Sequence, residues 1–293
     1  MSQVHAEREI ALNLYRHNTP LMVRVLANRR LTPPECANEV HHLTVQFPAG
    51  AFPFLEGQSA GFSPPGVNAR GRPNVPRLYS IASGRDGEDG TGTTLAICVK
   101  RVLYQTESGQ QAHGLASNML CDAQPGDLLP MTGPAGREFV LPEDPPANYL
   151  LLATGTGVAP FRAFAQRWAQ WPAEKRGKMW LFFGVQTHGD ALYADEWAAR
   201  AEDPHFRMTY AFSREETTAD GRRMYVQDRM RMAGQELLAW LRDGQAHIYI
   251  CGVKGMEVGI EAAFAALAQE AGLVWPVVRQ QLWLAGRWHV EVY

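Results

Sequence analysis

The segment from residue 149 to residue 161 constrains the fold most, because an apolar run there ends in a glycine turn. Residues 149–153 read YLLLA, which is typical of a buried strand. Residues 155–160 then read GTGVAP, and apolar residues follow at helical spacing: Phe161, Phe164, Trp168 and Trp171. This order predicts a strand, a turn and a helix whose free N–H groups can bind a phosphate. The spacing differs from the dinucleotide fingerprint G-x-G-x-x-G, so the segment alone is equally compatible with a tight structural turn.

Strands and helices alternate through the rest of the C-terminal half. We expect strands at 149–153, 179–185, 207–213, 247–251 and 288–293, and helices at 161–171, 193–201, 225–242 and 256–270. Such alternation predicts a parallel sheet that is covered on both faces, with ligands bound beyond the carboxyl ends of the strands.

The N-terminal half has a different pattern, in which short alternating segments are separated by turn-rich runs. We expect strands at 22–26, 42–47, 78–82, 94–102 and 127–131, and a helix at 113–121. Short strands with frequent turns favour an antiparallel β-barrel. The predicted organisation is a barrel domain at 1–141 with a polar surface segment at its start, a proline-rich linker, and an α/β domain at 149–293.

Length, charge and cysteine usage limit the function. The 293 residues suggest about two domains, and 46% apolar residues are enough for real cores. A net charge of −2 gives no overall attraction to nucleic acid, and the longest apolar runs are too short for a membrane span. The N-terminus does not resemble a signal peptide. The four cysteines form no C-x-x-C pair, so we expect no metal site and a cytoplasmic protein.

Residues 77–83, RLYSIAS, carry chemistry on a predicted barrel strand. Alternation places Arg77 and Tyr79 on one face and Leu78 and Ser80 on the other. An arginine suits a pyrophosphate, and a tyrosine ring offers a flat stacking surface. Taken alone, an exposed arginine and a half-buried tyrosine are also ordinary in any strand.

The resemblance of the chain to a known family rests on six motifs in order. They are RLYSIAS (77–83), GTGVAPF (155–161), SREE (213–216), RMYVQDR (223–229), CGVKGME (251–257) and the terminal RWHVEVY (287–293). Together they resemble the plant- and cyanobacterial-type ferredoxin–NADP reductases, and also the reductase part of benzoyl-CoA oxygenase systems. The resemblance runs from about residue 13 to residue 293. It implies an FAD-binding barrel, an NADP(H)-binding α/β domain, and electron exchange with a ferredoxin or flavodoxin.

The resemblance assigns FAD contacts to the barrel domain. Tyr79 stacks on the isoalloxazine ring, Arg77 holds the pyrophosphate and Ser80 bonds near flavin N5. Tyr104 packs against the adenine. Further contacts fall on Leu78, Cys98, Lys100, Gly114, Leu115, Ala116 and Ser117. Ala116 replaces a cysteine of the family pattern, but backbone N–H groups and Ser117 are retained for the phosphates.

NADP(H) contacts are implied at Thr156, Gly157, Val185, Ser213, Arg214, Arg223, Tyr225, Gln227, Gly252, Val253 and Glu257. Between residues 213 and 225 a hydroxyl, two guanidiniums and a ring come together, which suits a 2′-phosphate and a stacked adenine. A ribose 2′-hydroxyl favours an acidic partner, and none is evident at these positions. We therefore expect NADPH rather than NADH, although Arg222 and Arg223 are also compatible with a solvated loop pair.

Hydride transfer is implied to involve Ser80, Cys251, Glu291 and Tyr293. By resemblance Cys251 lies beside the nicotinamide carbon, Glu291 belongs to a proton path, and Tyr293 covers the second flavin face until nicotinamide displaces it. Cys251 is also compatible with a small buried apolar side chain, which is the commonest role of a free cysteine.

Partner docking in the family uses basic residues, and Arg16, Arg70, Arg72, Lys254 and Arg287 lie at or near matching positions. Trp283 and Leu284 stand where the family often has two lysines. This exchange favours a partner with a less acidic, more apolar face, unless Trp283 packs on its own domain.

Two other functions remain open at this point. One is a dedicated reductase component of an oxygenase, with the iron–sulfur centre on another chain because no cysteine cluster can hold it here. The other is a flavin-binding scaffold without turnover, against which Ser80, Cys251, Glu291 and Tyr293 argue.

Overall fold

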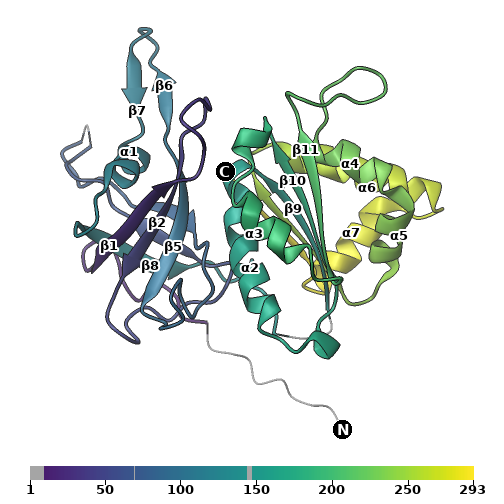
Figure 1. Cartoon of the computed structure of the whole chain (residues 1–293), viewed down its shortest axis with the longest axis horizontal. Helices are drawn as coiled ribbons and strands as arrows, with labels where there is room; N and C mark the ends of the chain where they lie inside the picture. Colours follow the sequence, from purple (N-terminus) through teal and green to yellow (C-terminus); the bar gives the residue numbers. More distant parts are fainter. Residues whose placement is uncertain (1–9, 69, 144–146) are drawn as a thin grey trace.

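The chain forms two domains that lie side by side, with the C-terminus at the boundary between them (Figure 1). The computed structural model describes residues 10–68, 70–143 and 147–293. Residues 1–9 of the predicted polar segment and residues 144–146 of the predicted linker lie outside the described residues. Strands with one short helix between them extend to Ala135, and strand–helix alternation begins at Asn148.

The first domain is a barrel of antiparallel strands. Its six-stranded sheet has the order β4-β3-β8-β1-β2-β5, formed by Arg77–Ser80, Ser59–Phe62, Leu128–Ala135, Leu21–Arg30, Val40–Gln46 and Thr94–Lys100. The edges of the sheet meet where Ile81, next to β4, bridges to Ile97 of β5. Closure pairs backbone groups that an open edge leaves exposed. The predicted antiparallel barrel is therefore confirmed.

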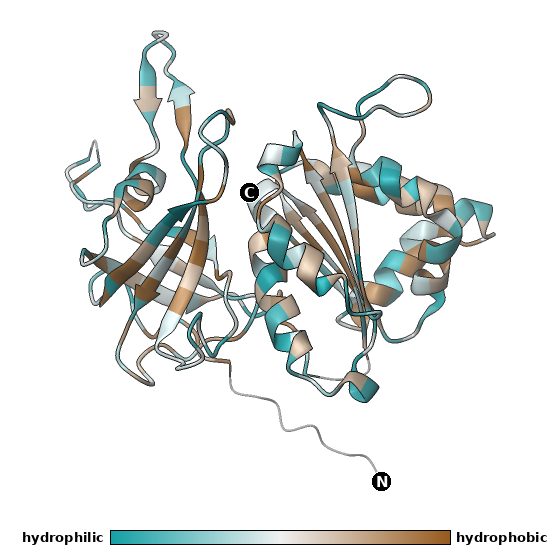
Figure 2. Ribbon diagram, viewed as in Figure 1, coloured by the Kyte–Doolittle hydropathy of each residue, from teal (hydrophilic) through white to brown (hydrophobic). Residues whose placement is uncertain are grey.

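Alternate side chains of these strands fill the barrel. Val23 of β1, Leu43 of β2 and Ile97 of β5 are fully buried, and helix α1 (Leu115–Asp122) adds Leu120 to the same core. This two-residue period is what places one face of each strand inside. Figure 2 shows the apolar residues concentrated on the strands of both domains.

Three barrel elements differ from the predictions. Strand β3 has the sequence SAGF, which carries no strong strand signal, and it was not predicted. Strand β5 ends at Lys100, and a hairpin of β6 (Leu103–Gln105) and β7 (Gln111–His113) follows. Helix α1 begins at Leu115 rather than at 113, because His113 pairs with Leu103 in that hairpin.

The second domain is a parallel sheet with helices on both faces. The strand order is β11-β10-β9-β12-β13, formed by Phe206–Phe212, Met179–Val185, Asn148–Thr154, Ala246–Gly252 and Trp288–Val292. Helices α2 (Ala159–Ala169) and α3 (Ala194–Arg200) cover the face toward the barrel (Figure 1). The other face carries α4 (Val226–Met232), α5 (Gly234–Arg242), α6 (Met256–Glu270) and α7 (Trp275–Leu284). The predicted α/β fold is confirmed.

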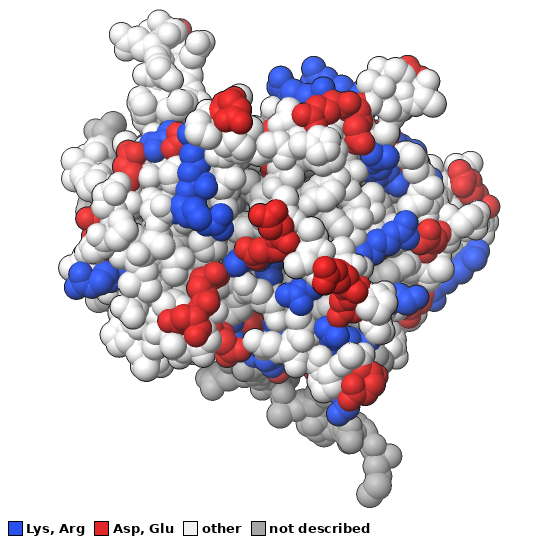
Figure 3. Space-filling view, viewed as in Figure 1, with Lys and Arg blue, Asp and Glu red and all other residues white. Residues whose placement is uncertain are grey.

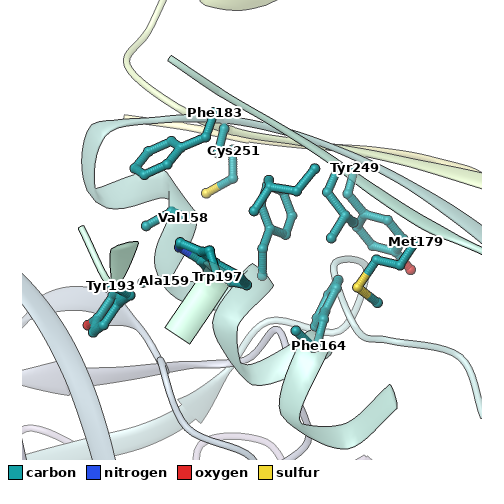
Figure 4. Packing of buried hydrophobic residues seen from close by; sticks show 14 of the residues in the cluster. Val158, Ala159, Phe164, Met179, Phe183, Tyr193, Trp197, Tyr249 and Cys251 are labelled. Atoms are coloured by element: carbon teal, nitrogen blue, oxygen red, sulfur yellow. The ribbon is translucent and has the colours of Figure 1, made fainter. Parts of the chain in front are cut away.

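Strand β9 is buried on both of its faces. One face contributes Tyr149, Leu151 and Ala153 to the core beneath α2 and α3, and the other contributes Leu150 and Leu152 to the core beneath α4 to α7. Figure 4 shows the first of these cores, in which Trp197 of α3 and Phe164 of α2 face side chains of the sheet, among them Phe183, Cys251 and Met179. An uninterrupted apolar run therefore means a central strand here.

Two helical predictions were wrong in detail. The predicted helix at 225–242 is divided at Ala233 into α4 and α5, and a Cβ at Gly234 would lie 2.9 Å from Leu267, so α5 packs closely on α6. Helix α7 was not predicted. It carries Pro276 in its first turn, where the missing N–H has no consequence.

No single helix in the described parts of the chain has the length and apolar composition of a membrane span; α6 and α7 meet those criteria only jointly, as a pair bent by 115°.

Arg162 of α2 joins the two domains. Its side chain is 8% exposed and donates to the Ala82 carbonyl at 2.9 Å and to Glu88 Oε1 at 2.6 Å, both in the barrel domain. It also donates to Glu196 Oε2 of α3 at 2.6 Å. A buried guanidinium needs such partners, because an unpaired buried charge costs several kcal/mol.

His42, which lies at this boundary, makes the free energy of unfolding depend on pH. Burial, and then the Arg162 and Arg29 charges, lower the pKa of His42 to about 3. In the unfolded chain the imidazole of His42 binds a proton below pH ~6.5. In the folded protein the same ring stays neutral until the pH is near 3, so between these pH values only the unfolded state is protonated at this residue. We expect the free energy of unfolding to fall by on the order of 3–5 kcal/mol from this group as the pH drops from 6.5 toward 3.

Denaturant titrations across that pH range check the expectation. His42→Asn, which has no titrating ring, should lose less stability than the wild type over the same range. Equal losses in the two proteins would contradict it.

Candidate functional site

Two adjoining cavities lie between the domains. The barrel-side cavity, about 850 Å³, is lined mainly by β4, β5 and α1 together with the C-terminal residues 291–293. The sheet-side cavity, about 600 Å³, lies at the carboxyl ends of β9, β10, β11 and β12. Lys100 and Thr156 line both cavities. Ligands in the two cavities would therefore meet at these residues.

The barrel-side cavity brings together every FAD contact that the resemblance implied in the barrel domain. The lining includes Arg77, Leu78, Tyr79, Ser80, Cys98, Lys100, Tyr104, Gly114, Leu115, Ala116 and Ser117. All four residues of β4 border the cavity, although alternation predicted two opposite faces. Strand β4 stands at one end of the sheet order, and the Tyr79 ring still packs on Phe62 in the barrel core.

Helix α1 presents its N-terminus to this cavity. Gly114 is the N-cap in an extended conformation, and the first helical residues, Leu115 to Ser117, line the cavity. First-turn N–H groups have no partner inside a helix and suit an anion. Ser117 Oγ donates to the Gly114 carbonyl at 3.1 Å and accepts from Val102 N–H at 3.2 Å. A Cβ at Gly114 would lie 2.8 Å from Ser117 Oγ, so a larger residue at the cap would displace the Ser117 hydroxyl.

The barrel-side donor set fits FAD. A dinucleotide with a pyrophosphate and two flat ring systems needs cationic or N–H donors and aromatic surfaces. Arg77, Lys100 and the α1 N-terminus supply the donors, and Tyr79, Tyr104 and Tyr293 supply the rings. Sequence reasoning missed His113, Asn74 and Asn68 in the lining, because no motif includes them.

Tyr293 connects the cavities. Its ring lines the barrel-side cavity, and its hydroxyl is 2.5 Å from Thr156 Oγ1 in the glycine turn. Its backbone N–H donates to the Gly252 carbonyl at 3.1 Å, which holds the chain end against β12. The last residue therefore stands over the place where the two cavities meet.

Glu291 and Cys251 are adjacent on neighbouring strands. They pair in the parallel register of β12 and β13, but only Glu291 lines a cavity. Burial raises the pKa of the Glu291 carboxyl. Burial, and then the Glu291 charge, raise the pKa of the Cys251 thiol well above its usual value. Cys251 is fully buried and lines neither cavity, so its thiol is protonated and does not contact a ligand in this arrangement.

The two glycines of the turn, Gly155 and Gly157, are required for different structural reasons. Gly155 has φ +52°, and a Cβ added there would meet no atom within 4 Å, so it opens to the cavity. A Cβ at Gly157 would lie 2.2 Å from the Cys251 carbonyl oxygen. Gly157 therefore lets the turn approach strand β12 closely.

The sheet-side cavity contains Thr156, Val185, Ser213, Tyr225, Gln227 and Val253 of the predicted NADP(H) contacts. Gly157, Arg214, Arg223, Gly252 and Glu257 do not line it. Asn38 and Val40 of the barrel domain do, and they were missed because only tertiary structure brings them there.

The arginines beside this cavity differ in their partners. Arg214 and Arg223 are exposed, and neither forms an ion pair with any of the described residues. Arg222, by contrast, donates to Asp220 Oδ2 at 2.6 Å. Two unpaired guanidiniums near Ser213 and Tyr225 are available to an anion.

The positively charged residues proposed for docking are mostly accessible. Arg16, Arg70, Arg72 and Lys254 are exposed, whereas Arg287 is half-buried and donates to the Asp243 and Ala246 carbonyls at 3.0 and 3.1 Å. Figure 3 shows both signs of charge interspersed over the face drawn. Trp283 and Leu284 are 65% and 69% exposed, and Trp283 also borders a pocket with Pro276 and Trp288.

One group of potential metal ligands is present in the described parts of the barrel. Donor atoms of Glu39, His41 and Cys121 lie within 4.8 Å of one another. Arg101 Nε donates to Glu39 Oε1 at 2.9 Å, and His41 Nε2 lies 2.8 Å from the same oxygen. The Glu39 carboxylate is therefore already bonded to a cationic side chain and to His41.

Comparison with known proteins agrees with this geometry. Residues 151–262 match the model of an oxidoreductase NAD-binding domain. The chain is 42% identical over 290 residues to a ferredoxin–NADP reductase of Synechocystis sp., covering 97% of this chain and 70% of that protein. It is 40% identical over 289 residues to the chloroplastic leaf-type ferredoxin–NADP reductase of Nicotiana tabacum, covering 97% and 80%.

Solved structures give the same result. The ferredoxin–NADP⁺ reductase of Plasmodium falciparum superposes with a TM-score of 0.76 at 26% identity, over 97% of this chain and 100% of that one. The same protein with 2′P-AMP gives a TM-score of 0.75 at 25% identity, again over 97% and 100%.

Proposed function

The chain belongs to the plant- and cyanobacterial-type ferredoxin–NADP reductase family, and we propose that it is an FAD-dependent enzyme that transfers electrons between NADPH and ferredoxin. The observation that carries this function is the meeting of the two cavities at Lys100 and Thr156, beneath Tyr293. One cavity suits FAD and the other suits NADPH. Their junction allows the reacting rings to come into contact.

FAD is held, in this proposal, by Arg77, Tyr79 and the N-terminus of α1, with Tyr104 against the adenine. When bound, FAD accepts two electrons from NADPH as hydride and releases them one at a time to an iron–sulfur partner. Ser80 and Glu291 both line the barrel-side cavity. Because burial raises the pKa of Glu291, its carboxyl holds a proton to a higher pH than an exposed carboxyl does, which suits a proton path.

NADPH is bound by the sheet-side cavity and its rim. Ser213, Arg214 and Arg223 bind the 2′-phosphate, and Tyr225 stacks on the adenine. The structure of the Plasmodium falciparum relative with 2′P-AMP supports this choice of ligand. Thr156, Val185 and Val253 hold the rest of the nucleotide toward the junction, and Cys251 lies beneath it.

A turnover assay tests this function. Protein saturated with FAD should reduce a dye acceptor and a plant-type ferredoxin with NADPH as donor. Dye reduction without ferredoxin reduction would indicate a flavoenzyme whose electron acceptor is a protein other than ferredoxin. Absence of both reactions in FAD-loaded protein would support the non-catalytic scaffold.

Partner docking carries a further prediction. Because Trp283 and Leu284 expose apolar surface where the family often has lysines, we expect kcat/KM for ferredoxin to depend only weakly on salt up to about 0.5 M. Trp283→Lys with Leu284→Lys should steepen that dependence toward an acidic ferredoxin. A steep fall in kcat/KM of the wild type with salt would refute the apolar docking surface.

The names of the matched relatives do not favour the oxygenase-reductase alternative. Flavodoxin as a second partner and a cytoplasmic location stay predictions from the sequence. Flavodoxin reduction is measurable in the same assay.

A further inference from the structure

A short chain of buried polar groups crosses the boundary between the domains. The Tyr193 hydroxyl, at the start of α3, is 3.0 Å from His42 Nδ1 of barrel strand β2. In the register of β2 and β5, His42 lies opposite Cys98, which packs in the same buried cluster as Tyr193. Tyr193 and His42 are each 6% exposed. One phenol therefore bonds the second domain to strand β2 of the first and packs in one cluster with Cys98 of the neighbouring strand β5.

The Tyr193 backbone indicates that this contact is maintained against strain. Its φ and ψ are 60° and 29°, in the left-handed region that residues with a side chain seldom adopt. Such conformations are unfavourable and persist only where surrounding contacts determine them. Figure 4 shows Tyr193 at the edge of the buried cluster, beside the ribbons of the barrel.

Charged groups hold the ring from the other side. The Arg162 guanidinium carbon lies 4.9 Å from the centre of the Tyr193 ring, and Arg162 itself bonds to Glu88 and Glu196. His42 Nε2 lies 3.7 Å from Glu88 Oε2. The ring and its hydroxyl are thus held on both sides, so the position of Tyr193 is narrowly determined.

Residues beside this contact form the walls of both cavities. Cys98 lines the barrel-side cavity, while Val40 and Leu192, close in sequence to His42 and Tyr193, line the sheet-side cavity. Asn38 Nδ2 also donates to Asp190 Oδ1 across the boundary at 2.9 Å, and both residues line the sheet-side cavity. A shift at Tyr193 would therefore move one cavity relative to the other.

We propose that the Tyr193 hydroxyl is a positioning group for hydride transfer, because its bond to His42 fixes the sheet-side cavity against the barrel-side cavity. This inference rests on the proposed function. Tyr193 contacts no reacting atom. It acts by holding the donor and acceptor sites at a reactive separation, where a displacement near 1 Å can cost up to about 100-fold in rate.

Tyr193→Phe tests the proposal, since it keeps the ring and removes only the hydroxyl. We expect the limiting rate of NADPH oxidation by the FAD-loaded protein to fall about tenfold. The dissociation constant of 2′,5′-ADP, which reports only the 2′-phosphate end, should stay within about twofold, and FAD content should be unchanged. Tyr210→Phe, a loss of a hydroxyl on β11, should leave the rate unaltered.

His42 variants keep the test decisive if Tyr193→Phe folds poorly. His42→Leu should slow the limiting rate as Tyr193→Phe does, whereas His42→Asn, whose amide can still bond the Tyr193 hydroxyl, should restore most of it. A Tyr193→Phe rate within about twofold of the wild type would overturn the proposal, as would equal rates in the two His42 variants. A wild type that does not oxidise NADPH would instead overturn the proposed function.

Discussion

Tyr293→Ser is expected to tighten NADP⁺ binding by about 10- to 100-fold and to lower kcat. The Tyr293 ring lines the barrel-side cavity where it meets the sheet-side cavity, and its hydroxyl is bonded to Thr156. In the proposed site nicotinamide displaces this ring before it stacks, so part of its binding energy is used for displacement. Without the ring, the displacement costs nothing and the product dissociates slowly.

Difference-spectroscopic titration with NADP⁺ and steady-state turnover measure the two effects. Tyr293→Phe is the matched control, because it keeps the ring and removes only the bond to Thr156. It should resemble the wild type far more closely than Tyr293→Ser does. Weaker NADP⁺ binding in Tyr293→Ser would contradict the lid role.

The double variant Arg214→Ala with Arg223→Ala is expected to raise the KM for NADPH by about 100-fold. Both guanidiniums are exposed and form no ion pair within the described parts of the chain, so a dianionic 2′-phosphate gains two charge-assisted partners there. The KM for NADH, which lacks this phosphate, should barely change. The preference for NADPH over NADH should therefore fall by nearly the same factor.

Arg222→Ala is the control variant, because it removes a positive charge from the same loop without removing a proposed 2′-phosphate ligand. Arg222 is already paired with Asp220, so its removal should change the KM for NADPH only a few-fold. An unchanged preference for NADPH in the double variant would show that the 2′-phosphate is bound elsewhere.

Local patterns predicted the sheet domain well because its strands are buried on both faces. Residues 149–153 are an uninterrupted apolar run and form the central strand β9. The lining of the barrel-side cavity was implied by the family resemblance, since β4, the segment from β5 to β6 and the first turn of α1 each carry a contiguous family motif. These short segments each supply several neighbouring side chains to one cavity.

Other features depend on contacts between distant segments. Gly157 is explained by the approach of β12, which lies far later in the chain, and no local pattern reveals that contact. Asn38 and Val40 reach the sheet-side cavity only because the domains meet there. Cys251 lies close to the junction in register with Glu291, yet its burial places it beneath the turn and outside both cavities.

Anaerobic mixing of the FAD-loaded protein with NADPH, followed by absorbance in the flavin band, tests most directly whether the two cavities hold reacting cofactors in contact. The account predicts rapid loss of the flavin absorbance with NADPH and a much slower loss with NADH at the same concentration. Flavin absorbance that persists in the presence of saturating NADPH, or a protein that binds no FAD, would contradict it.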